Sequence, residues 1–271
     1  MMKPTHRFQA DRLQAGYDQK TILKGIDLEI PSGKISVIIG ANACGKSTLL
    51  KTMARLIKPS AGSVLLDGQP IGSMPSKKLA RVLGMLPQSP IVPEGITVAD
   101  LVGRGRFPHQ SLLSGWSAKD YEAVAEAMEI MDITELANRN IDELSGGQRQ
   151  RVWIAMALAQ QTDILFLDEP TTFLDITYQV EILDLLTDLN HKYGTTIVMV
   201  LHDINLSARY ADYMFALRTG ELIYEGTPKQ VVTAESMLDI FGMDCMVIED
   251  PISGSPFTIP IGRHHTAKAE A

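Results

Sequence analysis

The 271-residue sequence is poor in cysteine and in long hydrophobic runs, and it has no excess of basic charge. Its two cysteines cannot build the disulfide framework of a small secreted domain. No apolar run approaches the roughly 18 residues of a membrane-spanning helix, and MMKPTHRFQADR at the start has no hydrophobic signal core. A net charge of -7 argues against a nucleic-acid surface, so we expect no nucleic-acid partner. These absences fit an intracellular globular protein.

What the sequence does contain is enough apolar material for a sizeable α/β core. Hydrophobic residues make up 45% of the chain and charged residues 21%. Short strands and turns alternate from about Phe8 to Asp67, and the sequence turns helical from Ser89 to about Gln160. The length is large for one compact lobe, so we expect a core with a subdomain.

One motif, GANACGKST at residues 40–48, stands between the apolar stretch ISVII and the helix-like LLKTMARL. A strand, a glycine-bearing loop and a helix in this order bind nucleotide phosphates, because backbone N–H groups approach closely and the helix N-terminus adds positive charge. Lys46 would reach the terminal phosphates, and the Ser47 hydroxyl would join a Mg²⁺ coordination shell. A chance turn is the alternative, which the flanking strand and helix disfavour. The motif predicts an ATP or GTP site.

Two further motifs follow later in the chain. LSGGQRQRVWIAMAL begins at Leu144, and DILFLDEPTTFLD covers residues 163–175. The apolar ILFL is typical of a buried parallel strand, and it delivers Asp168 and Glu169 at its carboxyl end, where α/β sheets bind ligands. Asp168 is suited to hold Mg²⁺ through its water shell, and Glu169 to orient or deprotonate an attacking water. The alternative, two solvated loop acids, is disfavoured beside a phosphate loop.

With these motifs the chain resembles, over nearly all its length, the ATP-binding subunits of ABC transporters. LSGGQ, residues 144–148, looks like the signature motif of that family. In the family two subunits pack head to tail, and each signature contacts the γ-phosphate held by the other subunit's phosphate loop. The resemblance implies a homodimer in which Ser145, Gly146, Gly147 and Gln148 serve the partner's site. Ser145 is also suited to cap the following helix, since capping and anion binding use the same N–H groups.

The resemblance implies roles for further residues. Tyr17 matches the aromatic residue that stacks on adenine, and Gln88 matches the glutamine that touches Mg²⁺. His202 matches the histidine that contacts the γ-phosphate and fixes Glu169, and residues 172–175 match the loop that crosses the dimer interface. A lone tyrosine or histidine at such places is more often structural, so these assignments depend on the resemblance.

The complete expected site is as follows. The catalytic residues are Glu169, His202, Lys46 and Gln88. The Mg²⁺ ligands are Ser47, Gln88 and Asp168. The residues that bind ATP are Tyr17, Gly40, Asn42, Ala43, Cys44, Gly45, Lys46, Ser47, Thr48, Ser145, Gly146, Gly147, Gln148 and Asp175.

The fold that the resemblance implies is α/β. It has a P-loop NTPase core, in which a mixed β-sheet is flanked by helices and joined by an antiparallel β-subdomain, plus a helical subdomain. We expect a single ABC ATPase domain over residues 1–271, with the helical subdomain inserted at approximately 89–160. Within that subdomain Ser117 and Asp120 predict a capping box, and Met128 and Met131 predict core packing.

The C-terminal half carries several local signals. The sequence predicts an amphipathic helix that ends at Gly194, a hairpin around Thr219-Gly220, and a last helix over TAESMLDIFG. A second hairpin with the turn PISGSP follows. His264 and His265 lie in a tail that we expect to be frayed, and solvation is favoured over metal binding for both.

The phosphate loop departs from the family pattern at Ala41 and Ala43, where the family usually has Gly-Pro-Asn-Gly at the start of the loop. An alanine at 43 matters only if the backbone there needs a positive φ, at a cost of about 1 kcal/mol. Cys44 lies at a helix N-terminus, which predicts a lowered pKa and higher reactivity than Cys245. The alternative is a buried, inert Cys44 thiol. Cys245 is expected to be a buried small hydrophobe.

The cargo is indicated only by the general similarity of two segments to known sequences. Residues 103–120 and 168–186 look like the ATPases of bacterial iron(III)–siderophore importers, whose relatives import haem and cobalamin. The resemblance implies ATP and Mg²⁺ as cofactors, multi-span permease partners, an indirect link to a substrate-binding protein, and a peripheral place at the cytoplasmic face of the inner membrane. Arg104, Arg106 and His109 either face anionic partner loops or form a solvated helix end.

Two other classes of function stay open from the sequence. A soluble ABC ATPase that acts on ribosomes or DNA usually carries two ATPase units, a long coiled coil or a basic face, and none of these is visible. A regulatory nucleotide-binding module without turnover is the other class, and the presence of Glu169 with His202 argues against it.

Overall fold

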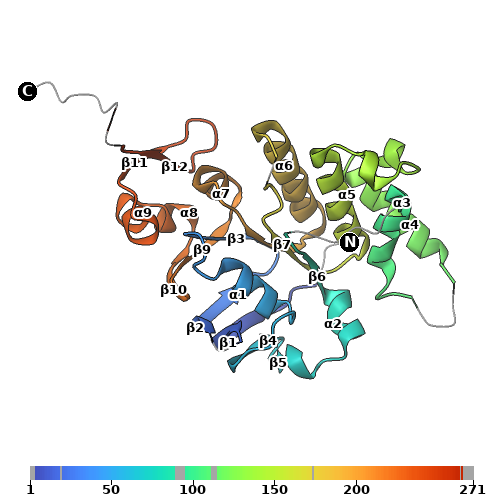
Figure 1. Cartoon of the computed structure of the whole chain (residues 1–271), viewed down its shortest axis with the longest axis horizontal. Coiled ribbons are helices and arrows are strands. Elements are labelled where there is room, and N and C mark those ends of the chain that lie inside the picture. The colour runs from blue at the N-terminus through green and yellow to red at the C-terminus, as the bar shows by residue number, and fades with distance from the viewer. Residues whose placement is uncertain are drawn as a thin grey trace, which may run out of the picture.

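The computed structural model describes residues 4–18, 20–88, 95–110, 115–172, 174–262 and 264. A six-stranded sheet with the order β10-β9-β3-β8-β7-β6 forms the centre of the molecule. A four-stranded antiparallel sheet, β2-β1-β4-β5, covers one side together with helix α1, and helices α5, α6 and α7 cover the other (Figure 1). This arrangement confirms the predicted α/β fold with a mixed sheet and an antiparallel β-subdomain.

The strands of the central sheet are parallel except at one edge. Their bounds are β3 (Ile35–Gly40), β6 (Leu83–Leu86), β7 (Ile164–Asp168), β8 (Thr196–Val200), β9 (Tyr213–Arg218) and β10 (Glu221–Gly226). Strand β10 pairs antiparallel with β9 through the predicted hairpin at Thr219-Gly220. Every residue of β3, β7 and β8 is buried, as expected for strands covered on both faces.

Alternate residues of these strands face two separate hydrophobic layers. Ile38 and Phe166 pack toward the antiparallel sheet, while Val37 and Leu165 pack toward the helices on the opposite side. Phe8 meets Phe166 edge-on, with 5.6 Å between ring centroids. The antiparallel sheet consists of β1 (Phe8–Tyr17), β2 (Lys20–Ile30), β4 (Ala61–Leu66) and β5 (Gln69–Pro70).

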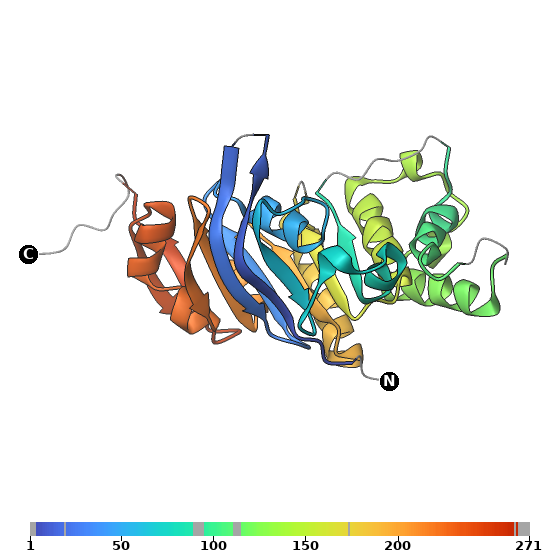
Figure 2. The same cartoon turned by 90° about the horizontal axis from the view of Figure 1, so that it is seen from below.

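Figure 2 shows green helices at one end of the molecule and the red C-terminal helices at the other, with the blue α1 between them. The α-helices are α1 (Lys46–Met53), α2 (Ser76–Val82), α3 (Val98–Gly103), α4 (Ala118–Ile130), α5 (Gly146–Ala159), α6 (Ile176–Tyr193), α7 (Ile204–Tyr210), α8 (Pro228–Val231) and α9 (Ala234–Phe241). Short 3-10 turns lie at Ile71–Ser73, Arg104–Arg106, Thr134–Leu136 and Ile141–Glu143.

Helices α3, α4 and α5 pack together in the stretch expected to be a helical subdomain, whose residues 89–94 and 111–114 lie outside the described part of the chain. The capping box of Ser117 and Asp120 starts α4, and Met128 and Met131 are buried, as predicted. The division of the chain into core and subdomain stays an interpretation of this packing.

The structure corrects the expectation for the basic residues near α3. Arg106 is buried and donates to Asp120 Oδ1 at 2.9 Å and to the Ala159 carbonyl at 2.7 Å, so it neither faces a partner nor is solvated. His109 donates from Nε2 to the Gln160 carbonyl at 2.8 Å. Hydrogen bonds from Ser117 and Arg106 lower the pKa of Asp120 to about 2, which keeps the buried ion pair charged. Of the three residues only Arg104 is exposed.

The C-terminal half follows the predicted order. Helix α6 ends at Gly194, whose φ of 72° closes the helix in the left-handed conformation. The last helix leads into a hairpin of β11 (Cys245–Glu249) and β12 (Pro256–Pro260). His264 is exposed, and His265 lies outside the described residues. In the part of the chain that is described, no helix combines the length and apolarity that a membrane crossing requires.

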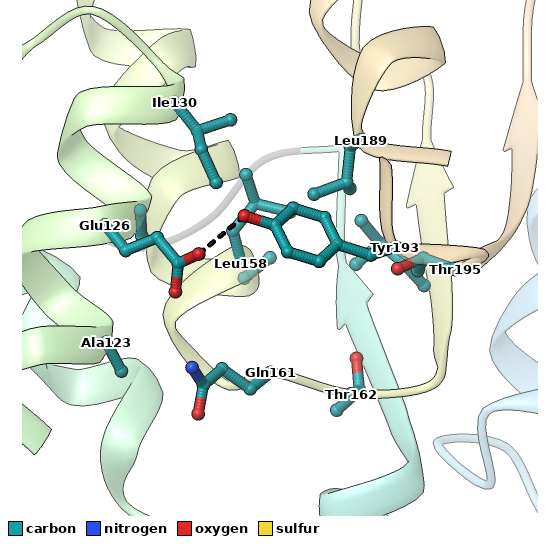
Figure 3. A pocket seen from close by; sticks show the side chains of 12 residues that line it. Ala123, Glu126, Ile130, Leu158, Gln161, Thr162, Leu189, Tyr193 and Thr195 are labelled. Carbon is teal, nitrogen blue, oxygen red and sulfur yellow. Dashed lines mark hydrogen bonds between the residues drawn. The ribbon is translucent and has the colours of Figure 1, made fainter. Parts of the chain in front are cut away.

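A cavity of about 80 Å³ marks the place where α4 and α5 meet the end of α6 (Figure 3). Ala127, Ile130 and Leu189 contribute apolar walls. At its edge the Tyr193 hydroxyl donates to Glu126 at 2.5 Å, and this bond links α6 to α4. The cavity is lined by none of the predicted site residues.

Candidate functional site

The loop between β3 and α1 has the backbone conformation that a phosphate site needs. Gly40 has a φ of 150°, and a Cβ there would lie 2.3 Å from the Leu217 carbonyl oxygen. Gly45, with a φ of 112°, is the N-cap of α1, and no side chain caps that helix end. Ala43 has a φ of 60°. The alanine that departs from the family pattern therefore stands at a position that needs the left-handed conformation. The strain costs about 1 kcal/mol for a residue with a Cβ.

Lys46 extends over this loop. Its Nζ donates to the carbonyl oxygens of Gly40 at 2.9 Å and Ala41 at 3.0 Å, and the residue is only 5% exposed. Neutral carbonyls satisfy the buried ammonium without neutralising it. The charge is therefore available to an anion placed in the loop.

Cys44 does not have the reactive environment that was predicted. The residue is buried, and a Cβ at Gly40 would lie 2.7 Å from its Sγ, so the thiol points beneath the loop. Burial raises the pKa of Cys44, and the positive charge of Lys46 opposes this effect only partly. The prediction of a lowered pKa was wrong, because desolvation of the thiolate outweighs the charges at the start of α1. Cys245 is buried as predicted.

Strand β7 brings Asp168 directly beneath Ser47. Asp168 is 1% exposed, and its Oδ1 accepts a hydrogen bond from the Ser47 hydroxyl at 2.8 Å. Its Oδ2 lies 3.6 Å from Lys51 Nζ and is buried without a hydrogen-bond partner in the described part of the chain. A buried carboxylate oxygen left in this state, next to a hydroxyl, fits a divalent cation with oxygen ligands.

Glu169 is held by side chains from three segments. His202 Nε2 lies 2.7 Å from its Oε1, while Gln88 donates to its Oε2 at 2.5 Å and Thr172 at 3.0 Å. Glu169 itself has a φ of 56°, which turns the chain sharply at the end of β7. A carboxylate fixed in one orientation, partly exposed at the sheet edge, can align and deprotonate a water.

These residues meet around one hollow of about 260 Å³. It is lined by Tyr17, Ile22, Asn42, Ala43, Gly45, Lys46, Ser47, Thr48, Glu169 and His202. Tyr17 is 51% exposed beside the phosphate loop, and its aromatic face is thus accessible. Asp168 lies below the hollow and is bonded to Ser47. Gln88 is connected to the hollow through its hydrogen bond to Glu169.

The expected signature residues lie elsewhere in the chain. Ser145 is exposed and caps α5, since its hydroxyl accepts from Gln148 N–H while Gln148 Oε1 accepts from Ser145 N–H. Asp175 caps α6 by accepting from Tyr178 N–H at 3.2 Å. Neither residue lines the hollow around Lys46. Phe173, in the predicted interface loop, lies outside the described residues.

The sequence reasoning missed two residues near the hollow. Lys51 follows Ser47 by four positions on α1, and that helical spacing alone places it on the same face, near Asp168. Ile22 reaches the hollow from β2, and no chemical signal in the sequence marks it.

Comparison with known proteins identifies the family of this site. The ABC transporter family matches residues 23–172. The chain is 51% identical to a probable siderophore transport system ATP-binding protein, YusV of Bacillus subtilis, over 96% of this chain and 95% of the relative. It is 49% identical to the ferric enterobactin transport ATP-binding protein FepC of Escherichia coli, over 97% of each chain. The dimeric bacterial ABC transporter cassette MJ0796 superposes with a TM-score of 0.72 at 28% identity, over 81% of this chain and 98% of that one.

The matched region contains the phosphate loop, the signature and Glu169, and both relatives align almost from end to end. ATP is accordingly the nucleotide that this chain binds. The chain belongs to the ABC transporter family of ATP-binding proteins, and it is an ATPase.

Proposed function

We propose that this chain powers the import of iron(III)–siderophore complexes, as one of two identical ATPase subunits attached to transmembrane permease subunits. The two relatives above are named for siderophore and ferric enterobactin transport, and their identity extends over nearly the whole chain. The chain would lie at the cytoplasmic face of a bacterial membrane. A substrate-binding protein would deliver cargo to the permease and so would contact this chain only indirectly.

One observation carries the two-subunit part of this proposal. The hollow around Lys46 and Glu169 is lined by the phosphate loop but by none of residues 144–148, although Ser145 and Gly146 are exposed at the start of α5. A helix N-terminus attracts anions. A second copy in head-to-tail orientation would bring its Ser145 and glycine N–H groups to the γ-phosphate, and the solved relative is itself dimeric.

Within each site we assign the following roles. Tyr17 stacks on adenine, the loop N–H groups and Lys46 hold the phosphates, and Glu169 takes a proton from the attacking water. His202 and Gln88 keep that carboxylate in place, as their bonds to its two oxygens indicate. Proximity and orientation supply most of the rate in phosphoryl transfer, since the protein forms no covalent intermediate.

A magnesium ion fits the oxygen atoms of this site. Ser47, Asp168 and Gln88 would hold it, with Asp168 acting through water. The buried Oδ2 of Asp168, which accepts no hydrogen bond from the described residues and has only Lys51 at 3.6 Å, supports that assignment. When bound, the ion neutralises charge on the phosphates.

The cargo is tested in cells that lack this gene and are complemented with a plasmid copy. Wild type should restore uptake of radioactive iron from a ferric siderophore, and Glu169→Gln should not. Glu225→Gln, at an exposed glutamate of β10, is the matched control and should behave as wild type. Restored uptake of haem or cobalamin, with ferric siderophore uptake unchanged throughout, would replace the proposed cargo. Copurification with ribosomes or DNA and no uptake defect would favour a soluble ABC ATPase instead.

A further inference from the structure

Tyr178, in the first turn of α6, lies flat against the signature backbone. A Cβ placed on Gly147 would be 3.2 Å from both Cδ1 and Cγ of the tyrosine and 3.5 Å from Cδ2. Three neighbouring ring atoms at nearly equal distance show that the face of the ring, rather than its edge, covers Gly147. The contact leaves no room for a side chain at 147 without a shift of a few tenths of an ångström.

A second contact one turn further fixes the same two helices. Arg151, four residues after Gly147, pairs with Glu181, three residues after Tyr178. These spacings place both contacts on facing sides of α5 and α6, which run in the same direction and lie side by side (Figure 1). The N-terminal turns of the two helices are therefore held at the same end.

The segment that carries Tyr178 is also tied to the catalytic carboxylate of its own chain. Thr172 donates to Glu169 Oε2, and Asp175 accepts from the backbone N–H of Tyr178. Tyr178 thus contacts Gly147 through its ring, while its backbone is bonded to the segment that follows Glu169. Tyr178 is 40% exposed, so its ring is accessible to solvent on one side while it covers Gly147 on the other.

We propose that Tyr178 is a positioning residue for the signature motif. Its ring supports Gly147 and so holds the first turn of α5 where its N–H groups would meet the γ-phosphate bound by the other subunit. These N–H groups have no acceptor within the helix, so their direction depends on how the first turn is supported. The inference rests on the proposed two-subunit function and deepens it, because it assigns a residue that acts on the partner's site and not on its own.

The first test compares Tyr178→Ala with Tyr178→Phe in the full chain. The alanine variant should keep the ATP affinity of the single subunit and lose at least about tenfold in kcat, because misplacing donors by roughly 1 Å can cost on the order of 100-fold. Tyr178→Phe keeps the flat ring and should retain turnover. Tyr121→Ala, at an exposed tyrosine of α4, is the matched control and should resemble wild type. Equal turnover of Tyr178→Ala and wild type would overturn the proposal, as would equal loss in the phenylalanine variant.

A mixing experiment shows on which subunit Tyr178 acts. A Tyr178→Ala subunit has an intact phosphate loop, and a Lys46→Ala subunit has an intact signature, so mixing the two should create one working site and give more turnover than either variant alone. When a chain with both substitutions is mixed with wild type, neither site of the mixed dimer is intact, so turnover should not exceed what the wild-type homodimers in that mixture supply. No gain from mixing would mean that Tyr178 supports its own chain's site and would overturn the inference.

The same experiment separates this inference from the proposed function. Ser145→Arg mixed with Lys46→Ala is run in parallel, and it should also restore turnover. If that pair restores activity while the Tyr178→Ala pair does not, only the role of Tyr178 is wrong. If neither pair restores activity, the shared site itself fails.

Discussion

The two helix N-termini that we assign to the phosphates of ATP differ in how their first turns are capped. Helix α1 starts at Gly45 with no side-chain cap, and its N–H groups open into the hollow beside the buried Lys46. Helix α5 starts at the exposed Ser145, whose capping box with Gln148 satisfies the N–H groups of these two residues. The first end has no side-chain cap, whereas the second is partly satisfied by its own side chains.

The difference indicates a division of labour. An uncapped helix end next to a buried cation binds anions strongly, because both donors and charge are already in place. A capped end carries about 1 kcal/mol of helix stability from its own side chains and has only the glycine N–H groups left to offer. We therefore expect the α1 end to determine ATP affinity and the α5 end to determine turnover.

The largest expected effect is a loss of ATP hydrolysis at the site beside α1, with ATP affinity unchanged. Glu169→Gln keeps the hydrogen bonding of the side chain but removes the base, so kcat should fall by about 100-fold to 10,000-fold while ATP still binds. The variant should accumulate as an ATP-bound dimer, measured by light scattering after size exclusion. Turnover close to that of the Glu225→Gln control would assign the base to another residue.

The next effect tests the α5 side. Ser145→Arg places bulk and charge at the signature, so dimer turnover should drop by roughly 100-fold or more, as when oriented donors are lost. ATP affinity of the single subunit should stay as in wild type. Ser145→Ala, which removes the hydroxyl and its cap but adds neither bulk nor charge, should cost far less turnover. If Ser145→Arg weakened binding in the single subunit as severely as Lys46→Ala, the two helix ends would not be separate.

A smaller effect concerns the strain stored in the α1 loop. Ala43 has a left-handed backbone, so Ala43→Gly should raise the free energy of unfolding by about 0.5–1 kcal/mol in urea titrations. Ala41 is not among the residues with positive φ. Ala41→Gly is thus the control, and it should leave stability unchanged or lower it. Stabilisation by both substitutions would show that strain at residue 43 is not the cause.

The sequence predicted the order of the fold because its signals are local. A buried strand, a glycine loop and a helix can each be recognised from a few consecutive residues. The same holds for Asp168 and Glu169 at the end of a strand. The bond between His202 and Glu169 was expected only from the family, since it joins residues on separate strands.

The errors came from burial, which no local pattern encodes. Arg106 appeared to be a surface charge because its partner Asp120 lies on another helix. The contact of Tyr178 with Gly147 could not be predicted for the same reason. Neither residue carries a local signal, and the contact depends on how α5 packs against α6.

The smallest expected effect is chemical labelling of Cys44, which lies within the α1 loop yet faces away from the hollow. Its burial and raised pKa predict slow reaction with maleimide at neutral pH, both with and without MgATP, and a rate that rises only under alkaline conditions. Cys245, which is also buried with a raised pKa, should react as slowly in the folded chain. Both thiols should label quickly in urea, and Cys44→Ala identifies which signal belongs to which residue. Rapid labelling of Cys44 that MgATP blocks would mean that the loop turns its thiol outward when no nucleotide is bound, and the α1 end would then be less pre-formed than its backbone indicates.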